Sequence, residues 1–105
     1  MSIDTPFHVF TDDEIEKATI LNGVYALHDD KETIYIGKGE GKEGIRARLR
    51  SHKAGYEGEC TKNAKYFNYE ACLNPQQRES ELLHEYKKLW DKLPRCNDVT
   101  PWFSL

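Results

Sequence analysis

The chain has 105 residues, of which 38% are hydrophobic and 31% are charged. This length allows one hydrophobic core, so we expect a single domain over residues 1–105. The composition excludes a collagen-like, disulfide-scaffold or wholly disordered chain. The net charge of −3 excludes a positive field over the whole molecule, although a local anion site remains possible.

The ends of the chain and its cysteines indicate a compartment. The first ten residues lack the basic start and apolar stretch of a signal peptide, and no apolar run is long enough to cross a bilayer. We therefore expect a cytoplasmic protein without a membrane partner. Cys60, Cys72 and Cys96 form neither a CxxC pair nor a zinc-binding spacing, so we expect three reduced thiols.

The N-terminal half predicts a short helix and a hairpin. Thr11 and Glu14 have the spacing of a capping box, which favours a short helix that includes Ile15 and Ala18. Residues 22–28 and 32–37 have strand-like composition and are separated by a polar turn, so they predict a hairpin. The Gly-rich residues 38–44 are expected to be irregular, and residues 45–54 predict a basic helix.

The C-terminal half predicts a loop, a strand and a long helix. Residues 55–63 are expected to form the loop and residues 65–72 the third strand. Asn74 can cap a helix that has Pro75 at its first position and that runs to about Leu93, where Pro94 stops it. After it, a tail to Leu105 carries Trp102 and Phe103, which we expect to fold back on the core.

The order ββαβα predicts an α+β (mixed α/β) domain, in which helices flank a small three-stranded antiparallel sheet.

Two tyrosines of the hairpin are candidates for a site. In the register that places Tyr25 directly opposite Tyr35, both phenols share one face of the sheet. The opposite face then carries Val24, Ala26, Ile34 and Ile36. Two interpretations remain open: a cross-strand packing pair, or two phenols that flank a reactive phosphate.

Positive charge is concentrated in residues 38–53, where six basic residues face two acidic ones, a local excess of +4. Arg48 and His52 are i, i+4 neighbours at the border of the apolar stripe. The outer flank of the helix carries Arg46, Arg50 and Lys53. An Arg fork beside a His that titrates near neutrality suits a phosphate site, but an ordinary amphipathic helix also explains the pattern. The Gly-rich stretch lacks P-loop spacing, and only Lys38 is a candidate phosphate contact there.

The long helix places a carboxylate on its apolar face. Glu79 lies in the middle of the stripe that contains Leu82, Leu83 and Tyr86, whereas Glu85 is expected to face solvent. A buried carboxylate is costly unless it is paired or binds a metal. The alternative is that Glu79 lies near the helix start, where the stripe is open and the helix dipole favours negative charge.

These residues form an ordered set. The segments are Gly23-Val24-Tyr25, Tyr35-Ile36-Gly37 ten residues later, Arg48 with His52, and a glutamate in the next long helix. In this order and spacing they resemble the GIY-YIG nuclease family, with Val24 in place of the usual Ile. The resemblance covers about residues 22–97.

The resemblance implies a phosphodiester hydrolase that uses a single Mg²⁺ or Mn²⁺ ion. Glu79 would hold the metal, and Arg48 would neutralise charge on the phosphate. Tyr25, or His52 acting with it, would deprotonate or position the attacking water. Tyr35 would hydrogen-bond within the site, and Lys38 would contact phosphate.

The family often ends its core with an Asn shortly after the glutamate helix, and Asn97 matches it. Asn97 lies 18 positions after Glu79 and 12 after Glu85. The shorter spacing favours Glu85 as the metal ligand, whereas the helix phase favours Glu79, which we choose. The further expected substrate contacts are Asn97 and the cations Arg46, Arg50 and Lys53.

The expected function is a Mg²⁺-dependent endonuclease that acts on DNA rather than RNA. A chain of this size leaves little surface for long sequence-specific readout, so structure or a protein partner would direct cutting. The alternative is a catalytically silent module on the same scaffold that binds nucleic acid or another protein.

Overall fold

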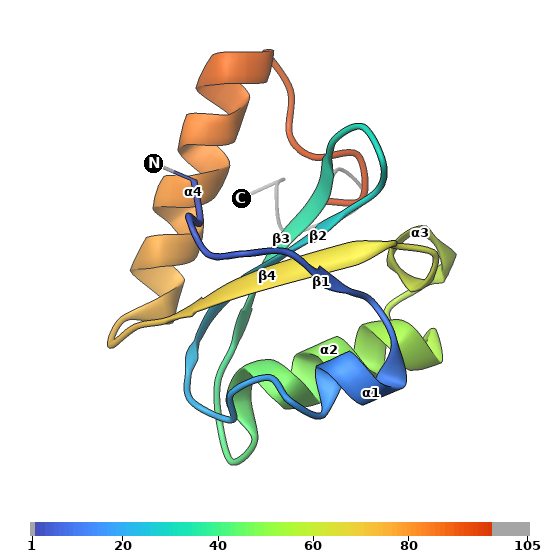
Figure 1. Cartoon of the computed structure of the whole chain (residues 1–105). Helices are drawn as coiled ribbons and strands as arrows, with labels where there is room; N and C mark the ends of the chain where they lie inside the picture. Colours follow the sequence, from blue (N-terminus) through green and yellow to red (C-terminus); the bar gives the residue numbers. More distant parts are fainter. Residues whose placement is uncertain (1, 98–105) are drawn as a thin grey trace.

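The computed structural model describes residues 2–97, and their fold is a mixed α+β domain (Figure 1). The tail to Leu105, whose Trp102 and Phe103 we expect to fold back on the core, lies outside the described residues. Four strands form one antiparallel sheet in the order β1-β4-β2-β3. Along the chain the elements are β1 (His8–Val9), α1 (Asp12–Ile15), β2 (Gly23–His28), β3 (Thr33–Gly39), α2 (Gly44–Ala54), α3 (Glu59–Lys62), β4 (Tyr66–Ala71) and α4 (Pro75–Trp90).

The predicted order ββαβα and the three-stranded sheet are therefore wrong in detail. The additional strand β1 has two residues and pairs with the outer edge of β4, and the additional helix α3 is a single turn. Elements this short have no measurable hydrophobic period, so periodicity in the sequence does not predict them. The strands and helices that the periodicity did predict appear close to their expected bounds.

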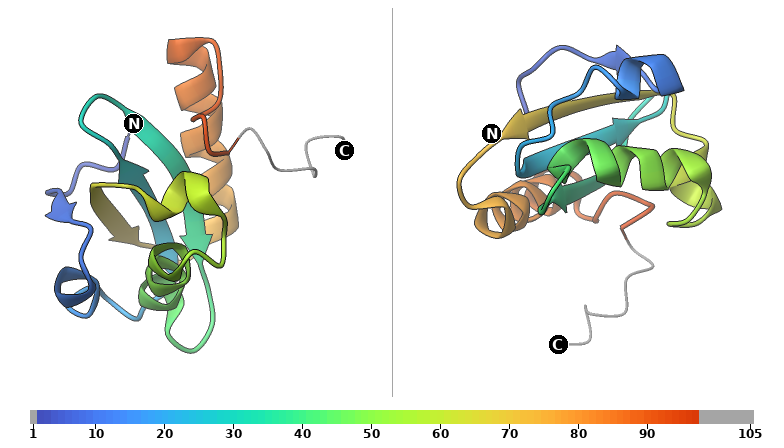
Figure 2. Two further views of the ribbon diagram at one scale, coloured as in Figure 1. Left: turned by 90° about the vertical axis from the view of Figure 1, so that its right-hand side faces the viewer. Right: turned by 90° about the horizontal axis from the view of Figure 1, so that it is seen from below.

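The sheet separates two hydrophobic clusters. On one face, Tyr25 and Leu27 of β2 belong to a cluster with Ile45 and Leu49 of α2. On the other face, Val24 and Ala26 belong to a cluster that includes Ile36, Leu82 and Leu83. Because side chains alternate along β2, α2 and α4 cover opposite faces of the sheet (Figures 1 and 2).

The hairpin register differs from the predicted one by two positions. Tyr25 pairs with Gly37 and Leu27 pairs with Tyr35, so the tyrosines are not directly opposite each other. A slip of two positions keeps every side chain on its face, and the two phenols still share the face toward α2. Ile34 is the unmatched residue at an irregularity of this ladder, and it joins the α2-side cluster rather than the expected cluster of Val24.

The helix termini follow local rules. Thr11 Oγ1 accepts from the Glu14 N–H at 3.3 Å, and Asn74 Oδ1 accepts from the Gln77 N–H at 3.3 Å, as the capping patterns predict. α4 ends at Trp90, earlier than the expected Leu93 and before Pro94. Asp91 adopts a left-handed conformation (φ 61°) and its N–H donates to the Lys87 carbonyl, which closes the helix.

After α4 the chain returns along the outer edge of β3 (Figure 2). The Cys96 N–H donates to the Ile34 carbonyl at 2.9 Å. Cys96 also forms a disulfide with Cys60 of α3, across a Cα–Cα distance of 5.7 Å, while Cys72 is a free thiol. The expectation of three reduced thiols is therefore wrong, because tertiary folding joins two cysteines that lie 36 residues apart.

Within residues 2–97, no helix is both long and apolar enough to cross a membrane.

Candidate functional site

Three aromatic rings meet on the α2 side of the sheet. The strands β2 and β3 supply Tyr25 and Tyr35, whose ring centroids lie 6.1 Å apart. Helix α2 supplies His52, whose ring lies 5.5 Å from Tyr25 and 4.8 Å from Tyr35. A Cβ atom on Gly37 would lie 2.6 Å from Tyr25 Oη and 2.7 Å from Tyr35 Cε2, so the ring cluster requires glycine at this position.

His52 is fully buried, and both of its ring nitrogens have partners. Nε2 lies 2.7 Å from Tyr25 Oη, and Nδ1 lies 2.8 Å from Thr61 Oγ1. Burial, together with the nearby Arg48 cation, lowers the pKa of His52 to about 4. The imidazole is therefore neutral at pH 7, with one protonated nitrogen and one that accepts.

The environment of Tyr25 fixes the direction of these hydrogen bonds. Burial and the neighbouring Tyr35 raise the pKa of Tyr25 well above its usual value, so the phenol keeps its proton. The guanidinium of Arg48, which interacts with the Tyr25 hydroxyl, can only donate. We therefore assign the Tyr25 O–H as donor to His52 Nε2, and His52 Nδ1–H as donor to Thr61 Oγ1.

Arg48 is half-buried beside both tyrosines and is held by a carboxylate. Its Nη1 donates to Glu57 Oε2 at 2.9 Å, and the same oxygen accepts from Ser51 Oγ at 2.8 Å. These donors help to hold the pKa of Glu57 below its usual value although partial burial raises it. Sequence analysis missed Glu57 and Thr61, because both lie in the region expected to be a loop and no period marks them.

Glu79 reaches the same site from α4. It is half-buried, and burial raises its pKa, while Lys38 and Arg48 act in the opposite direction. Glu79 in turn raises the pKa of Tyr35, whose main cause of elevation is burial. The carboxylate therefore lies within electrostatic range of the phenol and of both cations.

Glu85 lies elsewhere. It is half-buried rather than facing solvent as expected, and it lines an apolar groove of about 350 Å³ with Ala26, Ile36 and Leu82. These are residues of the cluster on the α4 side of the sheet. Glu79, by contrast, interacts electrostatically with Arg48 and Tyr35.

The three cations on the outer flank of α2 make contacts within the protein. Arg46 donates through Nε and Nη2 to the Ala18 carbonyl at 2.9 and 2.6 Å. Arg50 pairs with Glu16 at 2.6 Å and also with Glu43, and Lys53 lies 5.2 Å from the centre of the Phe10 ring. These contacts hold the segment around α1 against α2, a role that charge counting did not reveal.

Asn97 is buried and binds the backbone of β3. Its Oδ1 accepts from the Ile36 N–H, and its Nδ2 donates to the Ile36 carbonyl, both at 2.9 Å. The side chain acts as a clamp that continues the hydrogen-bond ladder beyond the edge strand. Both of its polar atoms are therefore used for the fold.

Lys38, the predicted phosphate contact, is half-buried near the end of β3. Its Nζ lies 3.3 Å from Glu40 Oε1.

Glu79 is the carboxylate that would hold a metal ion at this place. Among residues 2–97 there is no group of three or more His, Cys, Asp or Glu side chains that could hold a metal. Glu79 is a single hard oxygen donor beside cations that attract phosphate. Mg²⁺ typically takes one or two carboxylates and completes its shell with water and substrate phosphate, so this donor set fits Mg²⁺ and does not fit zinc.

A cavity of about 340 Å³ lies beside the rings. Its lining includes Tyr35, His52, Glu57 and Thr61, together with both cysteines of the disulfide.

Compared with known proteins, the chain matches no family model, no curated protein and no solved structure.

Proposed function

We propose that this chain is a Mg²⁺- or Mn²⁺-dependent endonuclease of the GIY-YIG type that hydrolyses phosphodiester bonds of DNA. The observation that carries the proposal is the convergence of residues from four elements. Tyr25, Tyr35 and His52 pack together, Arg48 lies against both phenols, and Glu79 is electrostatically coupled to Arg48 and Tyr35. Packing alone does not require a half-buried Arg and a half-buried Glu at this place.

Arg48 would bind the scissile phosphate, with Lys38 as a second contact. An arginine fork matches two phosphate oxygens and stabilises the negative charge that develops in the transition state. Since Glu57 pairs with Arg48 Nη1 in the protein alone, a phosphate would compete with this carboxylate for the guanidinium.

Tyr25 and His52 would together accept the proton of the attacking water. The water proton passes to Tyr25 Oη while the phenol proton passes to His52 Nε2 along the 2.7 Å hydrogen bond. His52 is a weak base because burial and, to a smaller extent, the positive charge of Arg48 lower its pKa. A bound phosphate offsets that positive charge, so substrate binding would itself raise the basicity of His52.

Glu79 would hold the divalent ion. When bound, this ion supplies Lewis-acid stabilisation of the leaving oxygen. Tyr35, beside Arg48, would orient the phosphate by hydrogen bonding. In this proposal, cutting is directed by DNA structure or by a protein partner.

The test is a cleavage assay on branched, nicked and plasmid DNA with Mg²⁺ or Mn²⁺. We expect cleavage by the wild type and a loss of about 100-fold or more in Glu79→Gln and Arg48→Ala. Glu81→Gln is the matched control, because Glu81 is an exposed carboxylate on the same helix, and it should retain activity. Equal inactivity of all four proteins on every substrate would contradict the proposal.

The Arg48–Glu57 pair favours one alternative, a silent module that binds nucleic acid or a protein without cutting. In such a module the pair would be a permanent ion pair. An enzyme and a silent module differ in their response to metal: Mn²⁺ should raise the melting temperature of the enzyme, and Glu79→Gln should abolish that rise. A melting temperature that does not depend on Mn²⁺ would favour the silent module.

A further inference from the structure

Helix α3 contributes one buried side chain, Thr61, and that side chain touches the candidate site. The other residues of this single turn are exposed. Thr61 Oγ1 lies 2.8 Å from His52 Nδ1, inside the protein. A helix of one turn has almost no stability of its own, so other contacts must keep Thr61 in place.

The Thr61 hydroxyl can stabilise the form of His52 that carries its proton on Nδ1, because it can accept a hydrogen bond from Nδ1–H. In the assigned arrangement Nδ1–H donates to Thr61, which leaves Nε2 free to accept from Tyr25. Without an acceptor at Thr61, a buried Nδ1–H would lack a partner, and the proton would favour Nε2. Nε2–H cannot accept the phenol proton, so the path from Tyr25 to His52 would close.

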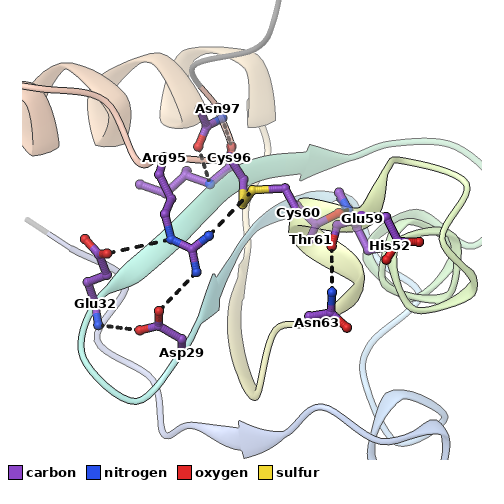
Figure 3. The surroundings of a disulfide bond; sticks show 11 residues. Asp29, Glu32, His52, Glu59, Cys60, Thr61, Asn63, Arg95, Cys96 and Asn97 are labelled. Atoms are coloured by element: carbon purple, nitrogen blue, oxygen red, sulfur yellow. Dashed lines mark hydrogen bonds and ion pairs between the residues drawn. A yellow bond between two sulfur atoms is a disulfide. The ribbon is translucent and has the colours of Figure 1, made fainter.

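The disulfide is the covalent link that holds α3 to the rest of the fold. Cys60, adjacent to Thr61, is bonded to Cys96, which is adjacent to the Asn97 clamp on β3 (Figure 3). The backbone hydrogen bonds of α3 itself are local, such as the one from the Lys62 N–H to the Gly58 carbonyl. The bond thus connects the segment that positions His52 to the C-terminal segment, which is hydrogen-bonded to the strand that carries Tyr35.

The surroundings of Cys60 favour thiol–disulfide exchange. Cys60 is exposed, whereas Cys96 is 2% exposed. Arg95 Nη1 lies 3.8 Å from Cys60 Sγ, and its guanidinium also pairs with Asp29 at 3.1 Å (Figure 3). A cation beside the exposed sulfur attracts an attacking thiolate, and attack at Cys60 Sγ releases Cys96 as the leaving thiolate.

We propose that Thr61 is a positioning residue for His52 and that the Cys60–Cys96 disulfide makes this positioning sensitive to redox state. Reduction by a dithiol transfers two electrons: the dithiol becomes a cyclic disulfide, and Cys60 and Cys96 each gain a proton as free thiols. With the link open, α3 is released and the Thr61–His52 hydrogen bond is lost. The consequence for cleavage rests on the proposed function, whereas the consequence for His52 does not.

The experiment is nitrogen-15 NMR of the His52 ring at pH 7, because the chemical shifts of the two nitrogens report which one is protonated. In the oxidised protein we expect the proton on Nδ1. Addition of dithiothreitol should shift population to the Nε2–H form, and the double variant Cys60→Ala/Cys96→Ala should show that form without reductant. Cys72→Ser is the control, and it should respond to dithiothreitol as the wild type does.

The role of Thr61 is tested separately in the oxidised protein. Thr61→Val keeps the shape but removes the hydroxyl, so it should reproduce the reduced spectrum. Thr61→Ser restores the hydroxyl and should restore the Nδ1–H form. A valine variant with an unchanged His52 tautomer would overturn the positioning role, and a tautomer unaffected by dithiothreitol would overturn the redox control.

Cleavage assays then connect the two proposals. If the wild type cuts DNA, reduction should lower its activity by at least about tenfold, in line with the loss of general-base assistance. If the tautomer responds as expected while no protein cuts DNA, the proposed function fails and the positioning stands.

Discussion

At the scale of single residues, His52 is a buried neutral base whose folded and unfolded forms titrate differently. An unfolded histidine has a pKa near 6.5, whereas burial and Arg48 lower the pKa of His52 to about 4 in the folded protein. As pH falls below 6.5, the unfolded chain binds the proton first, so the free energy of unfolding falls. Above that pH neither form is protonated, and the full stability is present.

This difference predicts a pH dependence of stability that His52 controls. Between pH 7.5 and 5, carboxyl groups with ordinary pKa values remain largely ionised. Over this range the free energy of unfolding of the wild type should fall by about 2 kcal/mol through His52. His28, whose pKa is also lowered by burial, adds a loss of the same sign. Urea unfolding across this window should give a smaller loss in His52→Gln than in the wild type. Equal losses would show that His52 does not titrate in this way.

At the scale of elements, the C-terminal segment and β3 depend on the Asn97 clamp. Asn97→Ala removes both hydrogen bonds to Ile36 and leaves the backbone of a buried residue without this partner. The free energy of unfolding should fall by about 1–3 kcal/mol. Asn63→Ala is the matched control, because Asn63 is exposed and its side chain donates to the nearby Glu59 carbonyl.

The control variant should lose no more than about 0.5 kcal/mol in the same denaturant titration. Similar losses in the two variants would contradict a special role for the clamp. Because the disulfide remains in both proteins, the comparison isolates the hydrogen bonds from the covalent link.

Elements could be predicted from the sequence where a period or a cap marks them. Strand alternation predicts the hairpin, and the 3.6-residue period predicts α2 and α4. Asn74-Pro75 also marks the start of α4. The hairpin register was wrong by two positions, since the turn does not by itself fix which residues pair. The Cys60–Cys96 bond could not be predicted, because it joins two segments whose proximity depends on the complete fold.

The same holds for the candidate site: residues in periodic elements could be predicted from the sequence, and residues in loops could not. Helix phase predicted that Glu79 is partly buried on the apolar face of its helix, and strand alternation placed Tyr25 and Tyr35 on one face of the sheet. Glu57 and Thr61 were missed, because a loop residue has no period that shows where its side chain points. The charged flank of α2 misled in another way: its cations gave a local excess of charge, yet Arg46 and Arg50 bind partners near α1.

At the scale of the whole molecule, the net charge of −3 and these internal contacts leave few cations for DNA. Lys38 and Arg48 are the two that lie at the site, so the logarithm of the binding constant should fall with the logarithm of salt concentration with a slope of about −2. A substantially steeper slope would show that the cations of α2 also bind phosphate.

The same binding measurement tests the Arg48–Glu57 pair. Glu57→Gln should tighten DNA binding by up to about fivefold, because it removes the ion pair that holds the Arg48 guanidinium. A partly exposed ion pair of this kind contributes about 0.2–1 kcal/mol. Glu81→Gln changes the net charge equally but lies at Arg78, so it should leave the affinity nearly unchanged. Equal tightening in both variants would assign the effect to net charge.

The segment beside β3 has one more consequence. An outermost strand presents backbone groups to which a strand of another molecule can add, the first step of sheet-to-sheet aggregation. Here the chain occupies that position itself, since Cys96 and Asn97 bind the carbonyl of Ile34 and both backbone groups of Ile36. The opposite border of the sheet ends in a strand of only two residues. Both borders therefore offer neighbouring molecules little template for fibre-like growth.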